Sequence, residues 1–199
     1  MRYHVMVDIE TWGTGSNAMP VSIGAAKFNN DTILDKFEVG IDPADFVQYG
    51  RTIDASTIMW WMSEKQRPAL DYWLALPKVD LYSAVRGFAD WCAIETPVFD
   101  TPDGKPTGQG VEMPVMVLEL ASLWGYGATF DNVILENAAK ACRIDWPFDH
   151  RSNECFRTLR KRFPDVEHEF VGTAHSAVDD ALNQALHLQK IAATHGIVL

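Results

Sequence analysis

Carboxylates occur at three places in the sequence where a strand or a helix is expected to begin or end. Asp8 and Glu10 follow the apolar residues 3–7, Asp131 starts a helical pattern, and Asp180 lies near the start of the longest helical pattern. Residues i and i+2 of a strand point to the same face, so Asp8 and Glu10 are expected to project together. Adjacent carboxylates repel unless they are protonated or bridged by cations, and oxygen ligands of this kind suit Mg²⁺ or Mn²⁺.

Each of these groups also has an ordinary structural explanation. Two carboxylates at an exposed strand end are common, and Asp131 suits a helix N-cap that accepts hydrogen bonds from backbone amides. His175 precedes Asp180 by five residues. A histidine side chain titrates near neutral pH and can take a proton from water, but acids and a surface histidine at a helix start are also unremarkable alone. The prediction of a site therefore depends on the whole set.

The elements that position these groups follow from hydrophobic patterns and turn residues. Residues 3–7, 19–28 and 33–41 predict three strands of an antiparallel meander. Helical patterns run from Asp54 to near Pro68, and over residues 79–92, 130–142, 157–162 and 175–195. Residues 95–114 hold four prolines and three glycines and predict a surface insertion. The pattern favours a single α/β domain over residues 1–199, with a mixed sheet flanked by helices.

Composition narrows the class of protein. The 199 residues are 47% hydrophobic, as in a globular protein, and no apolar run reaches the roughly 18–20 residues that cross a bilayer. Cys92, Cys142 and Cys155 match neither a disulfide framework nor a zinc pattern, which favours a reducing, cytoplasmic compartment. A net charge of −10 argues against binding long duplex and favours a small footprint, such as a single-stranded end.

Three segments, VDIETWG, GATFDNVIL and AHSAVDDA, occur in this order along the chain. They resemble the three motifs of the DEDD 3′–5′ exonuclease superfamily, in its histidine-containing DEDDh subgroup, over about residues 3–190. The segments TIMWW and WGYGATFD are most similar to the phage exodeoxyribonuclease A-like branch and its bacterial RNase-like relatives. The resemblance implies an RNase H-like (DnaQ-like exonuclease) fold and hydrolysis of single strands from the 3′ end. Many members carry an asparagine where this chain has Gly127.

The resemblance also implies the chemistry of the site. Asp8, Glu10, Asp131 and Asp180 would hold two Mg²⁺ ions, which Mn²⁺ could replace, and His175 would act as the general base. If His175 were helical, its spacing would favour Asp179 over Asp180 as the ligand. The family places this histidine on the loop before the helix, so we expect Asp180 to be the ligand.

The expected substrate contacts are less specific. They are Thr11, Trp12, Phe130, Trp61 and Arg157. Trp12 follows Glu10 by two residues, where its ring could stack on the terminal base. For Phe130, Trp60 and Trp61, core packing is favoured over substrate contact, and the basic group at residues 157–162 suits either phosphates or solvent.

The identity of the substrate rests on the branch resemblance alone, which favours single-stranded DNA. The alternative is an exoribonuclease that acts on RNA tails or short oligoribonucleotides. A further alternative is a non-catalytic nucleic-acid binding module, although all four carboxylates and His175 are present. Several relatives pair into homodimers, so the resemblance also allows a homodimer, for which the sequence indicates no interface.

Overall fold

The computed structural model describes residues 2–93, 97–98, 116–117 and 119–199. The strands are β1 (Arg2–Thr11), β2 (Pro20–Phe28), β3 (Ile33–Ile41), β4 (Lys78–Val79), β5 (Pro97–Val98), β6 (Met116–Val117), β7 (Glu119–Gly125) and β8 (Asn153–Cys155). The helices are α1 (Ala55–Trp61), α2 (Arg67–Ala75), α3 (Leu81–Ala93), α4 (Asp131–Cys142), α5 (Phe156–Arg162) and α6 (Ala177–His195), with 3₁₀ turns η1 (Pro43–Asp45), η2 (Glu64–Gln66) and η3 (His150–Ser152). Apart from β5, the insertion predicted at residues 95–114 lies outside the described residues.

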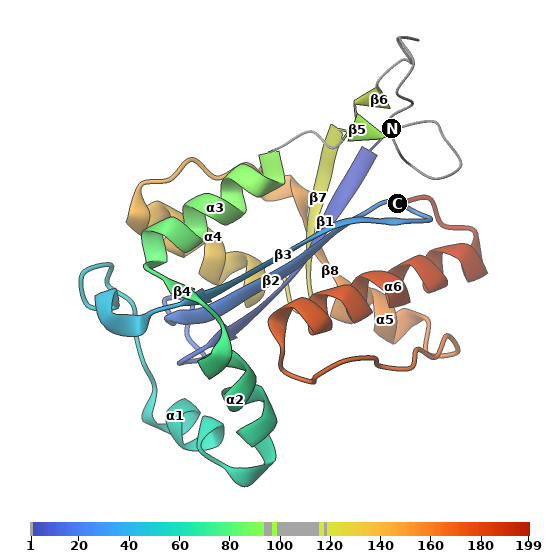
Figure 1. Cartoon of the computed structure of the whole chain (residues 1–199). Helices are drawn as coiled ribbons and strands as arrows, with labels where there is room; N and C mark the ends of the chain where they lie inside the picture. Colours follow the sequence, from blue (N-terminus) through green and yellow to red (C-terminus); the bar gives the residue numbers. More distant parts are fainter. Residues whose placement is uncertain (1, 94–96, 99–115, 118) are drawn as a thin grey trace, which may run out of the picture.

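The central sheet is mixed, as the sequence predicts. Its strand order is β4-β3-β2-β1-β7-β8. Strands β1, β2 and β3 form the expected antiparallel meander, whereas β7 runs parallel to β1 and β8 runs parallel to β7. Helices α5 and α6 lie on one side of the sheet and α3 and α4 on the other (Figure 1). This arrangement confirms the predicted RNase H-like mixed sheet flanked by helices.

The alternation of side chains along β1 decides which face carries the acidic residues. Val5, Val7 and Ile9 belong to the hydrophobic core that includes α3 and α4. Met6 instead belongs to the core on the other face, with the apolar residues of α6. Asp8 and Glu10 follow Met6 by two and four residues, so their side chains point to the same face as that of Met6. Both carboxylates therefore lie on the α6 side of the sheet.

Two features of the helices differ from the sequence prediction or extend it. The helical pattern from Asp54 to near Pro68 contains two helices, and Pro68 stands in the first turn of α2 rather than at the end of a helix. The first turn of a helix needs no hydrogen bond from that backbone nitrogen, so proline is compatible with it. None of the described helices is long and apolar enough to cross a membrane.

A glycine lets the start of α6 approach the sheet. A Cβ placed on Gly24 of β2 would lie 2.0 Å from both the carbonyl carbon of Ala177 and the backbone nitrogen of Val178. No other residue type fits at this position without moving the backbone of α6. Gly24 therefore sets how closely the first turn of α6, with its acidic residues, lies against the strands.

Candidate active site

A cleft of about 480 Å³ opens between β1, α4, α5 and α6. Its walls include the five residues that the sequence singles out for chemistry, Asp8, Glu10, Asp131, His175 and Asp180. They come from β1, from the first residue of α4, and from the loop and first turn of α6. Groups up to 172 positions apart in the sequence thus share one cavity, as the three ordered motifs predict.

Backbone and side-chain hydrogen bonds hold the carboxylates in place. The backbone N–H of Ile9 donates to Oδ1 of Asp131 over 3.4 Å, which ties α4 to β1 between the two acidic residues of that strand. The side-chain amide of Gln184 on α6 donates to Oδ1 of Asp8 over 2.8 Å. Strand β1 is therefore joined to α4 through Asp131 and to α6 through Asp8.

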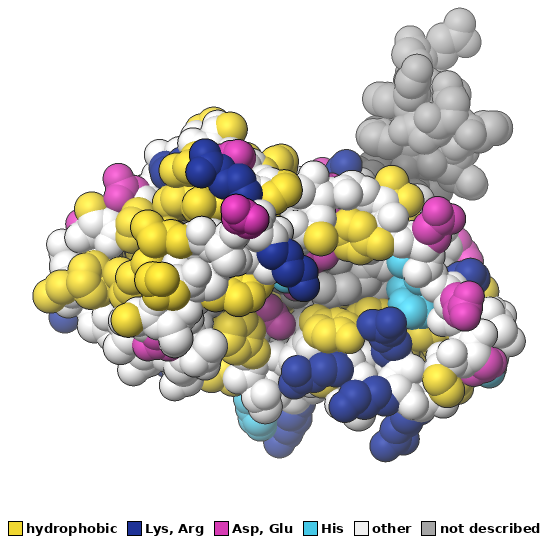
Figure 2. Space-filling view, turned by 90° about the horizontal axis from the view of Figure 1, so that it is seen from below, with side chains coloured by type: hydrophobic (Ala, Val, Ile, Leu, Met, Phe, Trp, Pro, Cys, Tyr) yellow, Lys and Arg dark blue, Asp and Glu magenta, His cyan; other side chains and the backbone are white. Residues whose placement is uncertain are grey.

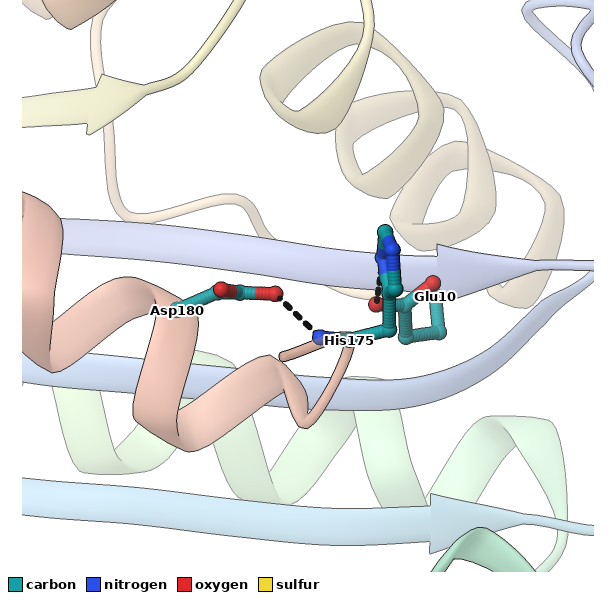
Figure 3. Close-up of side chains that lie close together, drawn as sticks. All are labelled: Glu10, His175 and Asp180. Carbon is teal, nitrogen blue, oxygen red and sulfur yellow. Dashed lines mark hydrogen bonds and ion pairs between the residues drawn. The ribbon is translucent and has the colours of Figure 1, made fainter. Parts of the chain in front are cut away.

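His175 precedes α6 in a left-handed backbone conformation, with φ of +64°. Its backbone N–H donates to Oδ2 of Asp180 over 2.9 Å, and its Nδ1 lies 3.8 Å from Oε1 of Glu10. Figure 3 shows the imidazole and the two carboxylates gathered beside β1, and ligand atoms of the three residues lie within 4.8 Å of one another. The side chain of Glu10 is 13% exposed and that of His175 is 43% exposed, so the imidazole remains open to water.

The choice between Asp179 and Asp180 follows from this loop. Because His175 is not helical, the four-residue helical spacing that would favour Asp179 does not apply. Oδ2 of Asp179 accepts a hydrogen bond of 2.8 Å from the backbone N–H of Thr173, so this carboxylate braces the loop. Asp180 lines the cleft and Asp179 does not.

Burial disfavours the charged forms of all four carboxylates, and repulsion from the others adds to this effect at Asp8 and Glu10. Burial raises the pKa of Asp8 well above its usual range, and the charges of Asp131, Glu10 and Asp180 raise it further. The pKa of Glu10 rises for the same reasons, and burial also raises the pKa of Asp180. Burial raises the pKa of Asp131 to about 7. The cleft thus concentrates negative charge that a bound cation would offset.

The donor set fits hard divalent cations. All four acidic side chains offer oxygen atoms, which Mg²⁺ and Mn²⁺ prefer over nitrogen or sulfur. Oε1 of Gln184 is buried and has no hydrogen-bond partner within the described part of the chain. A water molecule of a hydrated cation would satisfy that acceptor. The cleft therefore has both the charge and the polar atoms that a cation site requires.

A second cleft of about 380 Å³ adjoins the first and shares Ile9, Glu10 and Phe130 with it. Of the expected substrate contacts, Thr11, Phe130 and Trp61 line it. Trp61 is only 2% exposed, and its indole N–H donates to the carbonyl oxygen of Thr11 over 3.0 Å. Trp60 also lines this cleft, is 41% exposed, and presents its ring edge-on to His175 at 5.2 Å between centroids.

Trp12 departs from its predicted position. It lies outside the walls of both clefts and packs edge-on against Trp61 and Trp73, at 6.1 and 5.4 Å between ring centroids. The register of β1 against β2 shifts between Glu10 and Thr11, which interrupts the side-chain alternation on which the prediction depended. This packing does not favour stacking of Trp12 on a base, and Trp60 is the exposed tryptophan beside the site.

Gln184 is a residue of the site that the sequence prediction missed. It lines the cleft four residues after Asp180, on the same face of α6. Arg157, which the prediction included, lines the cleft from α5 together with Arg160. The helical spacing from Asp180 was the signal in the sequence that could have identified Gln184.

The fold and the acidic cleft define a class. A mixed RNase H-like sheet, with an aspartate–glutamate pair on its first strand and further aspartates from two helices, is the arrangement that the sequence resemblance to the DEDDh 3′–5′ exonucleases implies. The family match shows that this chain is a 3′–5′ exonuclease, a metal-dependent hydrolase of phosphodiester bonds. Residues 3–192 match the family described as the 3′-5′ exoribonuclease Rv2179c-like domain, and the chain belongs to this family.

Solved structures share the fold at low sequence identity. The nuclease domain of 3′hExo, a DEDDh family member bound to rAMP, matches with a TM-score of 0.62 and 13% identity, covering 99% of this chain and 94% of that one. Exonuclease I of E. coli in complex with single-stranded DNA matches with a TM-score of 0.63 and 11% identity over 98% of this chain. This chain spans only 42% of the exonuclease I chain.

A third structure, cell-death related nuclease 4, matches with a TM-score of 0.57 and 15% identity, covering 98% of this chain and 65% of that one. No curated protein matches the sequence. The family assignment therefore rests on the family match, and the solved structures support the fold.

Proposed function

We propose that this chain removes nucleotides from the 3′ ends of single-stranded RNA by two-metal-ion hydrolysis. The observation that carries the proposal is the convergence of Asp8, Glu10, Asp131 and Asp180 with His175 in one cleft. The family description names an exoribonuclease, so we place RNA before DNA, which reverses the order favoured by the sequence resemblance. DNA remains the second candidate because a solved structure of the same fold is a complex with single-stranded DNA.

The roles of the residues follow from their places in the cleft. Asp8, Glu10, Asp131 and Asp180 line the same cleft and would together hold the cations. Two bound divalent cations, with Mg²⁺ as the expected ion and Mn²⁺ as a substitute, supply activation of the attacking water and stabilisation of the leaving 3′ oxygen.

His175 is positioned to move a proton. Its imidazole is partly exposed at the mouth of the cleft, 3.8 Å from Glu10 and edge-on to Trp60. A neutral imidazole there would accept the proton of the attacking water, since Nε2 or Nδ1 can serve as the acceptor. Glu10 would orient the ring, and the hydrogen bond from the backbone of His175 to Asp180 holds the loop beside the carboxylates.

The test is cleavage of 5′-labelled single strands of RNA and DNA with the same sequence, in Mg²⁺, Mn²⁺ or EDTA. The expected result is a metal-dependent ladder that shortens from the 3′ end, faster on RNA, and absent for Asp8→Ala. Asp31→Ala is the matched control, because Asp31 is an exposed acid on the turn between β2 and β3. Faster cleavage of DNA would overturn the RNA assignment. Metal binding without cleavage of either strand would favour the non-catalytic binding module.

A further inference from the structure

Arg157 brings a positive charge to the acidic cleft. Its side chain is exposed and lines the cleft that Asp8 and Asp131 also line. Within the described residues, Arg157 makes no hydrogen bond and no ion pair, so its five N–H donors remain available. Arg160, one turn further on, donates to the hydroxyl of Tyr126 over 2.9 Å.

Gly127 is the neighbour that makes room for this guanidinium. A Cβ on Gly127 would lie 2.9 Å from Nη2 and 3.3 Å from Cζ of Arg157. The guanidinium thus occupies the space that a side chain at position 127 would take. The carbonyl oxygen of Gly127 accepts a hydrogen bond of 2.6 Å from the backbone N–H of Phe130, in the turn that leads into α4 and Asp131. Arg157 is therefore placed against the turn that positions one of the metal-ligand candidates.

The two clefts give a polarity to a bound strand. The second cleft, with Trp60 and Trp61, has the size and aromatic surface for the 3′-terminal nucleotide, and it meets the acidic cleft at Glu10 and Phe130. Of these two clefts, Arg157 lines the acidic one and not the second. A strand that fills the second cleft with its last nucleotide and places the scissile phosphate at the carboxylates would continue towards Arg157. Figure 2, which views this side of the molecule, shows Lys and Arg side chains around a hollow in the surface.

We propose that Arg157 binds the phosphate one nucleotide upstream of the scissile bond. The absence of a side chain at Gly127 leaves the space that the guanidinium needs to reach this phosphate. The inference rests on the proposed function, since it takes the acidic cleft as the place of hydrolysis. The planar guanidinium matches the geometry of a phosphate group and can donate two hydrogen bonds to it. In a chain with a net charge of −10, such a cation offsets the repulsion between the strand and the protein where the strand leaves the metal site.

Two dinucleotides isolate this contact. ApA and 5′-phosphorylated ApA share the scissile linkage and differ only in the phosphate upstream of it. The wild-type chain is expected to favour the phosphorylated form by about 10- to 100-fold in kcat/KM with Mg²⁺, the range for a hydrogen bond to a charged group. Arg157→Gln is expected to remove that preference, so that kcat/KM on the phosphorylated form falls by about 10- to 100-fold more than kcat/KM on ApA. Arg162→Gln is the matched control on the same helix, because Arg162 lines neither cleft, and it should keep the preference.

Gly127→Ala tests the second half of the inference. The added methyl group would meet only the far end of a flexible side chain, so the chain should fold and the guanidinium should move away. The preference for the 5′-phosphorylated dinucleotide is expected to fall as in Arg157→Gln. In the double variant, Gly127→Ala should cause no further loss, because the group that it displaces is already absent. Circular dichroism and the melting temperature confirm that each variant is folded.

The outcomes separate this inference from the proposed function. Equal losses on both dinucleotides in Arg157→Gln, or a preference that survives the substitution, would overturn the role of Arg157. If the wild-type chain cleaves no strand, the proposed function fails, and dissociation constants of the two dinucleotides measured with Ca²⁺ still decide the phosphate contact. A preference for the phosphorylated form in binding that is lost in Arg157→Gln would support the contact without hydrolysis, and no preference in the wild-type chain would refute it.

Discussion

The side-chain amide of Gln184 donates a hydrogen bond of 2.8 Å to Oδ1 of Asp8, and its own oxygen is buried without a partner in the described part of the chain. This hydrogen bond favours the charged form of Asp8 and opposes the effect of burial on its pKa. It also fixes one oxygen of the carboxylate, which orients the other. Gln184 is thus a positioning residue for the Asp8 carboxylate.

Gln184→Leu is expected to weaken metal binding and to leave the fold intact. The variant retains the volume of the side chain but loses the donor, so the pKa of Asp8 should rise further and the carboxylate should be less well oriented. Loss of such a supporting hydrogen bond typically costs about 10- to 100-fold in metal affinity. The measurement is the Mn²⁺ concentration that gives half-maximal activity.

Gln189→Leu is the matched control for this substitution. Gln189 lies on the same helix, and its amide donates to the carbonyl oxygen of Asn29 over 2.8 Å, away from the cleft. The control should lower the melting temperature and leave metal activation unchanged. Equal metal activation in Gln184→Leu and the wild-type chain would rule out the positioning role.

Asp180→Asn and Asp179→Asn are expected to differ strongly in turnover. Asp180 lines the cleft, and loss of its charge should lower kcat by about 10³-fold, since a metal site contributes several kcal/mol to charge stabilisation. Asparagine at position 179 can still accept the hydrogen bond from the N–H of Thr173, so the loop should hold its shape. Rates of both variants measured at saturating Mg²⁺ decide which of the two aspartates is the metal ligand. A larger loss for Asp179→Asn would reverse the assignment.

Trp60→Ala is expected to weaken substrate binding, whereas Trp12→Ala should weaken the fold. Trp60 is exposed beside His175, and stacking of a base on such a ring contributes about 1–3 kcal/mol, so KM should rise roughly tenfold or more. Trp12 packs against Trp61 and Trp73, and its removal should lower the free energy of unfolding by about 3 kcal/mol. Steady-state kinetics and urea unfolding of both variants test this division. An unchanged KM in Trp60→Ala would remove its stacking role.

Gly24→Ala should displace the start of α6. The new methyl group would meet the backbone at Ala177 and Val178, which cannot move like the end of a side chain. We expect the free energy of unfolding to fall by about 1–3 kcal/mol, as for overpacking of a core, and turnover to fall because Asp180 and Gln184 shift with the helix.

Gly87→Ala is the matched glycine control for this substitution. A Cβ at Gly87, in the middle of α3, would have its nearest neighbour at 3.9 Å. Since alanine favours a helix more than glycine, this variant should gain about 1 kcal/mol and keep full turnover. A Gly24→Ala variant as stable and active as Gly87→Ala would show that the close approach is unnecessary.

The sequence allowed the sheet and the acidic positions to be predicted because both depend on short-range signals. The alternation of side chains along β1 places Asp8 and Glu10 on one face. The predicted bounds of β3 and α4 agree closely with the structure. The orientation of Trp12 could not be predicted, since a register shift after Glu10 becomes visible only when β2 is paired with β1. The approach of Arg157 to Gly127 joins residues 30 positions apart and depends on how α5 packs.

The raised pKa values of the carboxylates predict that pH and metal act together on stability. In the metal-free chain, Asp8, Glu10, Asp131 and Asp180 bind protons more tightly when folded than when unfolded. Their contribution to the free energy of unfolding is therefore fully present below the unfolded pKa of about 4. It is lost as pH rises through the folded values, which for Asp131 is about 7. Cations require the deprotonated carboxylates, so their stabilising effect should grow over the same range.

Thermal unfolding in EDTA and in excess Mg²⁺, at intervals between about pH 5 and pH 8, measures this coupling. The difference in melting temperature between the two conditions should be small at the acid end and increase towards pH 8, because protons compete with the cation at low pH. In Asp8→Asn the difference should be smaller at every pH, since one charge and one ligand are removed. A difference that is as large at pH 5 as at pH 8 would contradict cation binding at these four carboxylates, because protonation would then have no effect on it.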